Sequence, residues 1–408
     1  MGGCIGKPSA SYEHRYVDDG GYSAAEAQTD HAAESPRRSE GHLSELRDLG
    51  RASSGGAHFA PSGDYAYHGY AYHPSHGRAP QWSSGYVADT AASPERESHA
   101  MRTALSDGDC QLGGYLVDRH ILGRPVDRST LEKLRSANQT VAETRRALKY
   151  GRGNVSVDVR DSGGASSLRT EAGRLARRAI PQKLASGESL NPAVRAVAAA
   201  LTAQAGMCGE HAHVAGLLHA AKLEEGEHVY VMGSSNPSHN WVEWRGETSD
   251  RGQGIVIDAW GKASAILAED GSLSHAGHHA EVDHHYDRAT GAHAHAQLRE
   301  LQAQRQWRMD AEFGRQMNKL GPNFRYPEET VWEPASVFSD AFAQSVAHAM
   351  NEVDPAVLAM HATDMARTLG ASGSPEVARA AGRIAEVAAD PMGYPLRSHP
   401  ALAEDDDF

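Results

Sequence analysis

The first 110 residues of this chain contain too few aliphatic side chains to build a hydrophobic core. Serine, glycine, alanine, histidine and tyrosine dominate the segment, and its isoleucine, leucine and valine residues are limited to Ile5, Val17, Leu43, Leu46, Leu49, Val87 and Leu105. A segment of this composition cannot bury enough apolar surface to offset the chain entropy lost on folding. We therefore expect residues 1–110 to form a disordered leader and the core to lie in the rest of the 408-residue chain.

The charge balance and the cysteine content exclude several classes of protein. The chain has 40 lysines and arginines against 53 aspartates and glutamates, a net charge of −13, and no region carries the basic face of a nucleic-acid-binding protein. No window approaches 18 consecutive apolar residues and the N-terminus lacks a hydrophobic signal core, so we expect neither a spanning helix nor a secretory signal. The three cysteines, Cys4, Cys110 and Cys208, are too few for a disulfide framework, which indicates a reducing compartment.

Beyond residue 110 the sequence changes to apolar segments that alternate with helix caps and turns. Cap pairs such as Asn191-Pro192 and Asp354-Pro355 mark helix starts, whereas apolar residues at every second position mark strands. The predicted helices span 129–150, 192–206, 208–221 and 355–370, with another from 375, and the predicted strands span 155–159, 228–232, 239–245 and 254–259.

These elements predict an α+β protein divided into six segments. They are a leader at 1–110, an N-terminal region at 111–190, a core at 191–265, a histidine-rich loop at 266–295, a helical C-terminal region at 296–395 and an acidic tail at 396–408.

Cys208 lies at the predicted start of a buried helix, directly after a glycine turn. The unpaired amides and the positive end of the helix dipole at such a position favour thiolate, which is the nucleophilic form of cysteine. The same amides can donate to an oxyanion when an acyl carbon is attacked. Most free cysteines are small core residues, so a catalytic interpretation requires a base near this sulfur.

His239 and Asp258 supply a base and an acid that orients it. If the strands that carry them form a hairpin centred on residues 246–251, the two side chains are cross-strand neighbours on one face. Taken singly, His239 can be a strand-end histidine and Asp258 a turn residue. Together with Cys208 they match a Cys-His-Asp triad, in which aspartate fixes the imidazole tautomer and imidazole takes the thiol proton. His211, one helical turn after Cys208, is the alternative base.

Three short motifs resemble the core of the transglutaminase-like, papain-like cysteine enzyme superfamily. They are Gly-Met-Cys-Gly-Glu-His-Ala at 206–212, His-Asn-Trp-Val-Glu-Trp at 239–244 and Val-Ile-Asp-Ala-Trp-Gly at 256–261. Joined to the N-terminus and the helical C-terminal region, they resemble the AvrPphE/HopX/XopE family of bacterial type III effectors, which are injected into plant cells. The resemblance implies a papain/transglutaminase-like core, a triad of Cys208, His239 and Asp258, and a family-specific region within 111–190. It also implies host plant proteins as substrates and a bacterial secretion chaperone as a further partner.

One position departs from the papain pattern. Papain-type enzymes place an oxyanion-hole glutamine six residues before the nucleophile, where this chain has Thr202, and Gln204 is out of register. The backbone amide of Cys208 is therefore the first candidate for an oxyanion donor, and the strand near Trp241 is the second.

The N-terminus carries a lipidation pattern. Gly2 is a candidate for N-myristoylation once Met1 is removed, although Gly6 stands where the motif prefers serine or threonine. One myristoyl chain holds a protein to a membrane only marginally, so palmitoylation of Cys4 would supply the second signal. We expect a chain that is made in a bacterium, secreted by a type III system and anchored at the host plasma membrane.

A metal-binding interpretation is weaker. Histidine-rich tracts bind zinc, nickel or copper, but a glycine-alanine-histidine loop lacks the supporting groups that fix metal geometry. We therefore expect no metal and no cofactor at His278, His279, His284 and His285. The sequence as a whole favours a cysteine-dependent acyl-transfer enzyme of protease, deamidase or transglutaminase type. The alternatives are a catalytically silent, membrane-tethered effector that binds host proteins and, after it, a histidine-rich metal binder.

Overall fold

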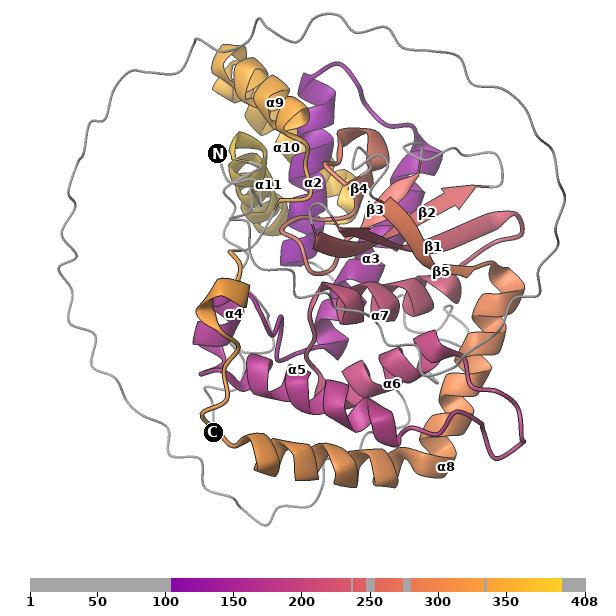
Figure 1. Cartoon of the computed structure of the whole chain (residues 1–408). Coiled ribbons are helices and arrows are strands. Elements are labelled where there is room, and N and C mark those ends of the chain that lie inside the picture. The colour runs from indigo at the N-terminus through magenta and orange to yellow at the C-terminus, as the bar shows by residue number, and fades with distance from the viewer. Residues whose placement is uncertain (1–103, 236–237, 247–253, 274–279, 334–335, 391–408) are drawn as a thin grey trace, which may run out of the picture. The chain divides into compact units, whose positions relative to one another are not determined.

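The computed structural model describes residues 104–235, 238–246, 254–273, 280–333 and 336–390, and these residues form an α+β protein (Figure 1). Its sheet has five antiparallel strands in the order β4-β3-β2-β1-β5. Most of the leader, including Gly2 and Cys4, and the acidic tail lie outside the described residues. The strands are β1 (Glu227–Ser235), β2 (Ser238–Gly246), β3 (Ile255–Ile257), β4 (Ile266–Leu267) and β5 (Ala280–Tyr286).

The helices begin where the sequence provides caps. Asn191 caps one of them through Oδ1, which accepts from the Ala193 amide at 2.8 Å, and Asp354 caps another in the same way. The helices are α2 (Asp107–Ile121), α3 (Arg128–Ala147), α4 (Ser156–Asp161), α5 (Ala165–Ala176), α6 (Pro192–Ala203), α7 (Cys208–Ala220), α8 (Arg288–Leu320), α9 (Asp340–Glu352), α10 (Pro355–Leu369) and α11 (Ser374–Ala389).

Helix α7 packs on the face of the sheet formed by β1 and β2. Gly216 permits this close approach, because a Cβ there would lie 2.7 Å from the Val231 side chain. Helix α6 covers α7, and α5 and α8 pack against α6 in turn, as Figure 1 shows. Cys208 therefore begins a helix that is held between the sheet and further helices.

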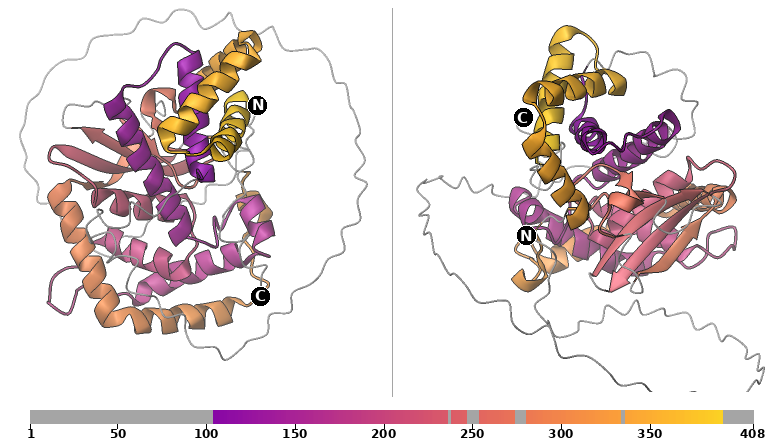
Figure 2. Two further views of the ribbon diagram at one scale, coloured as in Figure 1. Left: turned by 180° about the vertical axis from the view of Figure 1, so that it is seen from behind. Right: turned by 90° about the horizontal axis from the view of Figure 1, so that it is seen from above.

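A second group of helices surrounds α2. Helices α10 and α11 pack against α2 and against each other, and Figure 2 shows them beside α2 from two further directions. Helix α3 connects this group to the core, because it contacts α2, α7 and β3. No helix among the described residues is long and apolar enough to span a membrane.

Three sequence-based expectations are wrong. Residues 155–159 do not form a strand: Val155 makes one bridge to Trp332, and α4 starts at the next residue. Asp158 is fully buried in α4, where it accepts from the Arg152 amide and pairs with the Arg152 guanidinium. This pair stabilises a helical turn, which the alternation of valines does not predict. The leader boundary is also earlier than predicted, because α2 starts at Asp107 and buries Cys110.

The third concerns the histidine-rich segment at 266–295, which was expected to be a loop. It contains β4, β5 and the first turns of α8. His285 stacks on Tyr230 of β1 with ring centroids 4.8 Å apart, and Nε2 of His295 lies 2.7 Å from the Leu217 carbonyl. Asp287 caps α8 by accepting from the Thr290 amide at 2.7 Å. Histidine rings thus serve as packing groups here, which a composition argument does not detect.

Candidate functional site

Cys208 is the first residue of α7, as the sequence predicts, and its side chain is partly buried. The helix start is anchored by Glu210, whose carboxylate accepts from the Met207 amide at 2.9 Å. Arg174 of α5 holds the same carboxylate with two bonds of 2.8 and 2.9 Å. Burial opposes ionisation of Glu210, but Arg174 and the Met207 amide lower its pKa to about 2. A charged, immobilised glutamate therefore fixes the turn that presents Cys208.

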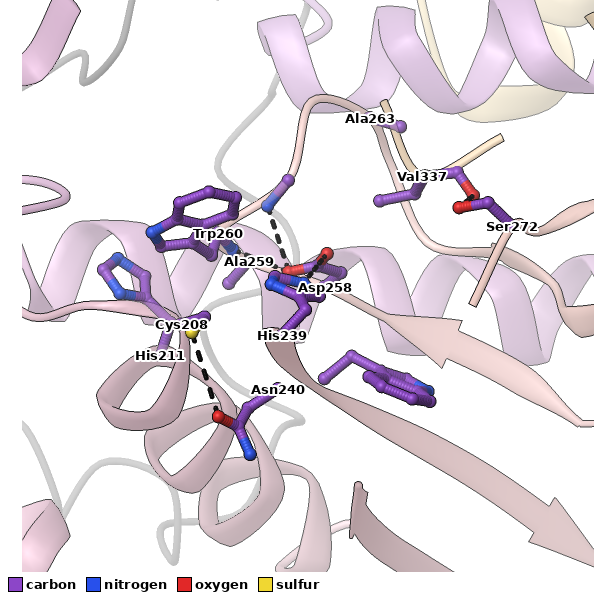
Figure 3. Close-up of polar contacts among 12 residues, drawn as sticks. Cys208, His211, His239, Asn240, Asp258, Ala259, Trp260, Ala263, Ser272 and Val337 are labelled. Carbon is purple, nitrogen blue, oxygen red and sulfur yellow. Dashed lines mark hydrogen bonds and ion pairs between the residues drawn. The ribbon is translucent and has the colours of Figure 1, made fainter. Parts of the chain in front are cut away.

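His239 and Asp258 form a buried pair beside Cys208. Nε2 of His239 lies 2.8 Å from Oδ2 of Asp258, and the two side chains are 10% and 4% exposed. Figure 3 shows both side chains next to Cys208. Because Nε2 is bonded to the carboxylate, Nδ1 remains to exchange a proton with a thiol. The structure thus brings together the three residues that the sequence singles out as a triad.

The strand register differs from the symmetric hairpin that predicts this pair. Val242 lies opposite Ile257, so continuation of the ladder places Asp258 beyond β3 and opposite Trp241, not opposite His239. The register is therefore shifted by two residues. A shift of one residue would have moved Asp258 to the other face, whereas a shift of two keeps both side chains on the same face as diagonal neighbours.

The loop after β3 holds Asp258 in place. Its second oxygen, Oδ1, accepts from the amides of Trp260 and Gly261, both at 3.0 Å. Arg145 of α3 donates to the carbonyls of Ala259, Gly261 and Ala263 at 3.1, 2.8 and 3.1 Å. The guanidinium of Arg152 donates to the Trp260 carbonyl at 2.8 Å. Two arginines from outside the motifs therefore fix the loop that carries the aspartate.

Burial and the charge pair act in opposite directions on His239. Burial alone would lower its pKa, but the Asp258 carboxylate and the contact with Cys208 raise it to about 10. Burial would likewise raise the pKa of Asp258, but His239 and the amides of Gly261 and Trp260 lower it. The pair is thus an imidazolium and a carboxylate at neutral pH. A positively charged imidazole beside a cysteine is the arrangement that generates thiolate nucleophiles.

His211, the alternative base, is placed differently. Its Nδ1 lies 2.9 Å from the Met207 carbonyl, and its Nε2 is buried without a hydrogen-bond partner. Burial is the main reason that its pKa is lowered to about 4, so the ring is neutral at ordinary pH. No carboxylate orients it in the way that Asp258 orients His239. The geometry favours His239 as the base.

Several side chains considered as oxyanion donors already make other hydrogen bonds. The Thr202 hydroxyl donates to the Ala198 carbonyl at 3.0 Å within α6, and the Gln204 oxygen lies 3.5 Å from the Arg169 guanidinium. The indole of Trp241 donates to Glu243 at 2.9 Å. The Cys208 amide is at the first position of α7, where helix amides have no acceptor within their own helix.

Sequence reasoning missed Arg145, Arg152 and Asn240. The oxygen of Asn240 lies 3.8 Å from the Cys208 sulfur (Figure 3). Asn240 stands inside the His239 motif, so its proximity to the site had a sequence signal. Arg145 and Arg152 lie 108 or more positions before the loop carbonyls to which they donate. A single sequence carries no sign of such distant contacts.

The histidine-rich segment and the lipidation candidates complete the set of positions considered in the sequence. Among the described residues, no group of three or more histidine, cysteine, aspartate or glutamate side chains is arranged to hold a metal ion. His278 and His279, like the lipidation candidates Gly2 and Cys4, lie outside the described residues. Comparisons of the chain with protein-family models, with curated proteins and with solved structures find no match.

Proposed function

We propose that the chain is a cysteine-dependent acyl-transfer enzyme with a papain/transglutaminase-like core. Cys208 is the nucleophile, His239 is the base and Asp258 orients the imidazole. The observation that carries this proposal is the buried 2.8 Å contact between His239 and Asp258, next to a cysteine that begins a buried helix. Neighbouring residues that hold a charged His-Asp pair in a fixed geometry are typical of catalytic sites.

The reaction follows from the positions of the three side chains. The Cys208 thiolate attacks the carbonyl carbon of an amide, and the Cys208 backbone amide stabilises the oxyanion that forms. His239 then gives its proton to the departing amine, which leaves a thioester on Cys208. Water that attacks the thioester gives hydrolysis or deamidation, and an amine that attacks it gives a cross-link.

We further propose that the enzyme is a bacterial type III effector that acts on host plant proteins. This step rests on the resemblance of the three motifs to the AvrPphE/HopX/XopE family. Lipidation of Gly2 and Cys4 in the host would place the site at the plasma membrane, where two lipid signals give stable anchoring. The chain would then meet membrane-associated substrates, and a secretion chaperone would act before delivery.

Selective alkylation tests the proposal, because the three cysteines of the chain serve as mutual controls. Burial, with Asp109 nearby, raises the pKa of Cys110 to about 11, so this thiol should resist iodoacetamide. At mildly acidic pH only an activated thiolate reacts quickly, since an ordinary thiol titrates near ~8.5. We expect fast labelling at Cys208 alone, measured by peptide mass mapping, and slow labelling of Cys208 in His239→Ala.

Equal labelling rates at Cys208 and Cys4 would contradict the enzyme proposal. In that case the alternative gains weight, namely a membrane-tethered effector that binds a host protein without turnover. The two are separated in plant cells by Cys208→Ala, which abolishes the host response if turnover is required and leaves it intact if binding alone is sufficient.

A further inference from the structure

Asn240 links the candidate nucleophile to the edge strand of the sheet. The Cys208 thiol donates to Oδ1 of Asn240 across 3.8 Å. At the other end of the amide, Nδ2 donates to Oδ2 of Asp283 at 2.6 Å and to the Met232 carbonyl at 3.2 Å. Two acceptors therefore hold the NH₂ group on the far side. The oxygen end of the amide is the end that faces the sulfur.

A bulge in β5 directs Asp283 toward Asn240. Val231 lies opposite His284 and Met232 lies opposite Val282, so Asp283 is the extra residue on β5. Bulges of this kind turn a side chain away from its regular direction and are common next to active sites. The Asp283 carboxylate thereby reaches across β1 to a residue of β2.

Strand β1 has a glycine where the side chains of Asp283 and Asn240 meet across it. Gly233 stands at the crossing point, where a Cβ would lie 2.8 Å from the Asp283 carboxylate and 3.0 Å from the Asn240 amide nitrogen. A glycine inside a strand weakens it and commonly marks a close approach of other groups. The bulge in β5 and the glycine in β1 are thus two separate features that both permit the short hydrogen bond between Asn240 and Asp283.

We propose that Asn240 is a further active-site residue and that Asp283 is its positioning residue, so that the resting site presents a hydrogen-bond acceptor to Cys208. An amide oxygen accepts a proton from a thiol but has no proton to offer a thiolate. The Asn240–Asp283 pair therefore favours the thiol, whereas His239 favours the thiolate. This inference rests on the proposed function, because it concerns the reactivity of the same sulfur.

The pH midpoint for alkylation of Cys208 measures the balance between thiol and thiolate, and therefore the opposing effects of the Asn240–Asp283 pair and His239. The other charged or titratable side chains close to the sulfur are unchanged in every variant below; they are His239, Asp258, Arg174, Glu210 and His211. Asn240→Asp places a carboxylate at the sulfur, which should raise the midpoint by about one pH unit or more, as like charges do. Thermal unfolding of each variant shows whether it is folded.

Asp283→Ala and Gly233→Ala test the orientation of the amide. Each breaks the 2.6 Å bond from Nδ2 to the carboxylate and leaves only the longer bond of 3.2 Å to the Met232 carbonyl. The NH₂ group is then held less firmly and can turn toward the sulfur to donate to the thiolate. We expect both variants to lower the midpoint, and Gly233→Ala does so without removing any charge. Asp283→Asn keeps an oxygen that accepts from Nδ2 and should shift the midpoint less than Asp283→Ala. Glu281→Gln removes a neighbouring exposed charge from β5 and is the matched control.

Midpoints equal to that of the wild type in Asn240→Asp and Asp283→Ala would overturn the inference, as would a higher midpoint in Asp283→Ala. Asp283 is exposed, so its variants remain informative if Gly233→Ala does not fold. Failure of the proposed function gives a different result. A wild-type midpoint near an ordinary thiol value of ~8.5 contradicts the enzyme, whereas the inference is judged on the differences between variants.

Discussion

At the scale of single residues, the site depends on a histidine that keeps a positive charge although it is buried. Burial alone would lower the pKa of His239, and the adjacent carboxylate of Asp258, together with the contact with Cys208, reverses that effect. His211 shows the contrast, because it is buried without such a partner and its pKa is lowered to about 4. The charge of each histidine is therefore set by its neighbour and not by its distance from Cys208 along the chain.

Removal of the Asp258 charge should return His239 to the behaviour of a buried histidine. In Asp258→Asn, which keeps the size of the side chain, we expect the pKa of His239 to fall from about 10 by about 2 or more, the usual effect of losing a close opposite charge. An NMR titration of the His239 ring nitrogens measures it. An unchanged titration would show that Asp258 does not control the imidazole.

The same pair makes stability depend on pH. The folded pKa of His239 is raised, so its stabilising contribution is complete below the ordinary imidazole value of about 6.5 and is lost as the pH rises through about 10. The lowered pKa of Asp258 makes its contribution complete above the ordinary carboxyl value of about 4 and lost at lower pH. Urea unfolding of wild type and His239→Gln should differ more at pH 5.5 than at pH 10. Equal differences at the two pH values would contradict this account.

How much of the site is predictable from sequence can be judged on these residues. Cys208, His239 and Asp258 were identified because their motifs are local and because β2 and β3 are close in the chain. The predicted pairing is wrong by two residues, because Val242 pairs with Ile257, whereas hairpin symmetry would pair it with Ile255. Asp283 was not identifiable, because its role depends on a bulge that only the paired strand defines.

At the scale of elements, helices from outside the motifs hold the segments that carry Cys208 and Asp258. Arg145 on α3 fixes the loop that follows β3, and Arg174 on α5 fixes the start of α7 through Glu210. Both arginines lie in the predicted N-terminal region at 111–190, which therefore packs directly on the predicted core. This region supports the geometry of the triad without supplying a member of it.

Arg145→Lys should weaken the fold and the site together. A lysine ammonium cannot reach three carbonyls in the planar geometry of a guanidinium, so carbonyls of the loop lose their charged donor. We expect a loss of about 2 kcal/mol in the free energy of unfolding and slower alkylation of Cys208. Arg128→Lys is the control on the same helix, because Arg128 is 91% exposed and should change stability by less than about 0.5 kcal/mol. Equal effects of the two substitutions would exclude the role given to Arg145.

The prediction of helices and strands succeeded where caps were specific and failed where a short alternation or the composition was the only guide. Asn191-Pro192 and Asp354-Pro355 both mark real helix starts. The valine pattern at 155–159 was misleading because the buried pair of Arg152 and Asp158 decides the local structure. The histidine-rich segment became a strand and a helix because its rings find partners on β1 and α7, which a single sequence does not specify.

At the scale of the whole molecule, the proposal joins an enzyme to a lipid anchor that the described residues do not include. In plant cells, Gly2→Ala should move the protein from the membrane fraction to the soluble fraction, because the acyl acceptor is lost. Cys4→Ala should shift it partly, since one myristoyl chain binds only marginally. Cys208→Ala should stay with the membranes. Membrane association of Gly2→Ala equal to that of the wild type would contradict N-terminal anchoring.

The most direct test of the central claim is the formation of an acyl-enzyme on Cys208. Treated with p-nitrophenyl acetate, the protein should release nitrophenolate in a burst as the thiolate takes the acetyl group. Peptide mass mapping should then find a thioester at Cys208, reduced in His239→Ala and absent in Cys208→Ala. Acetylation confined to lysines, or a thioester that forms equally fast without His239, would contradict a Cys208–His239–Asp258 triad.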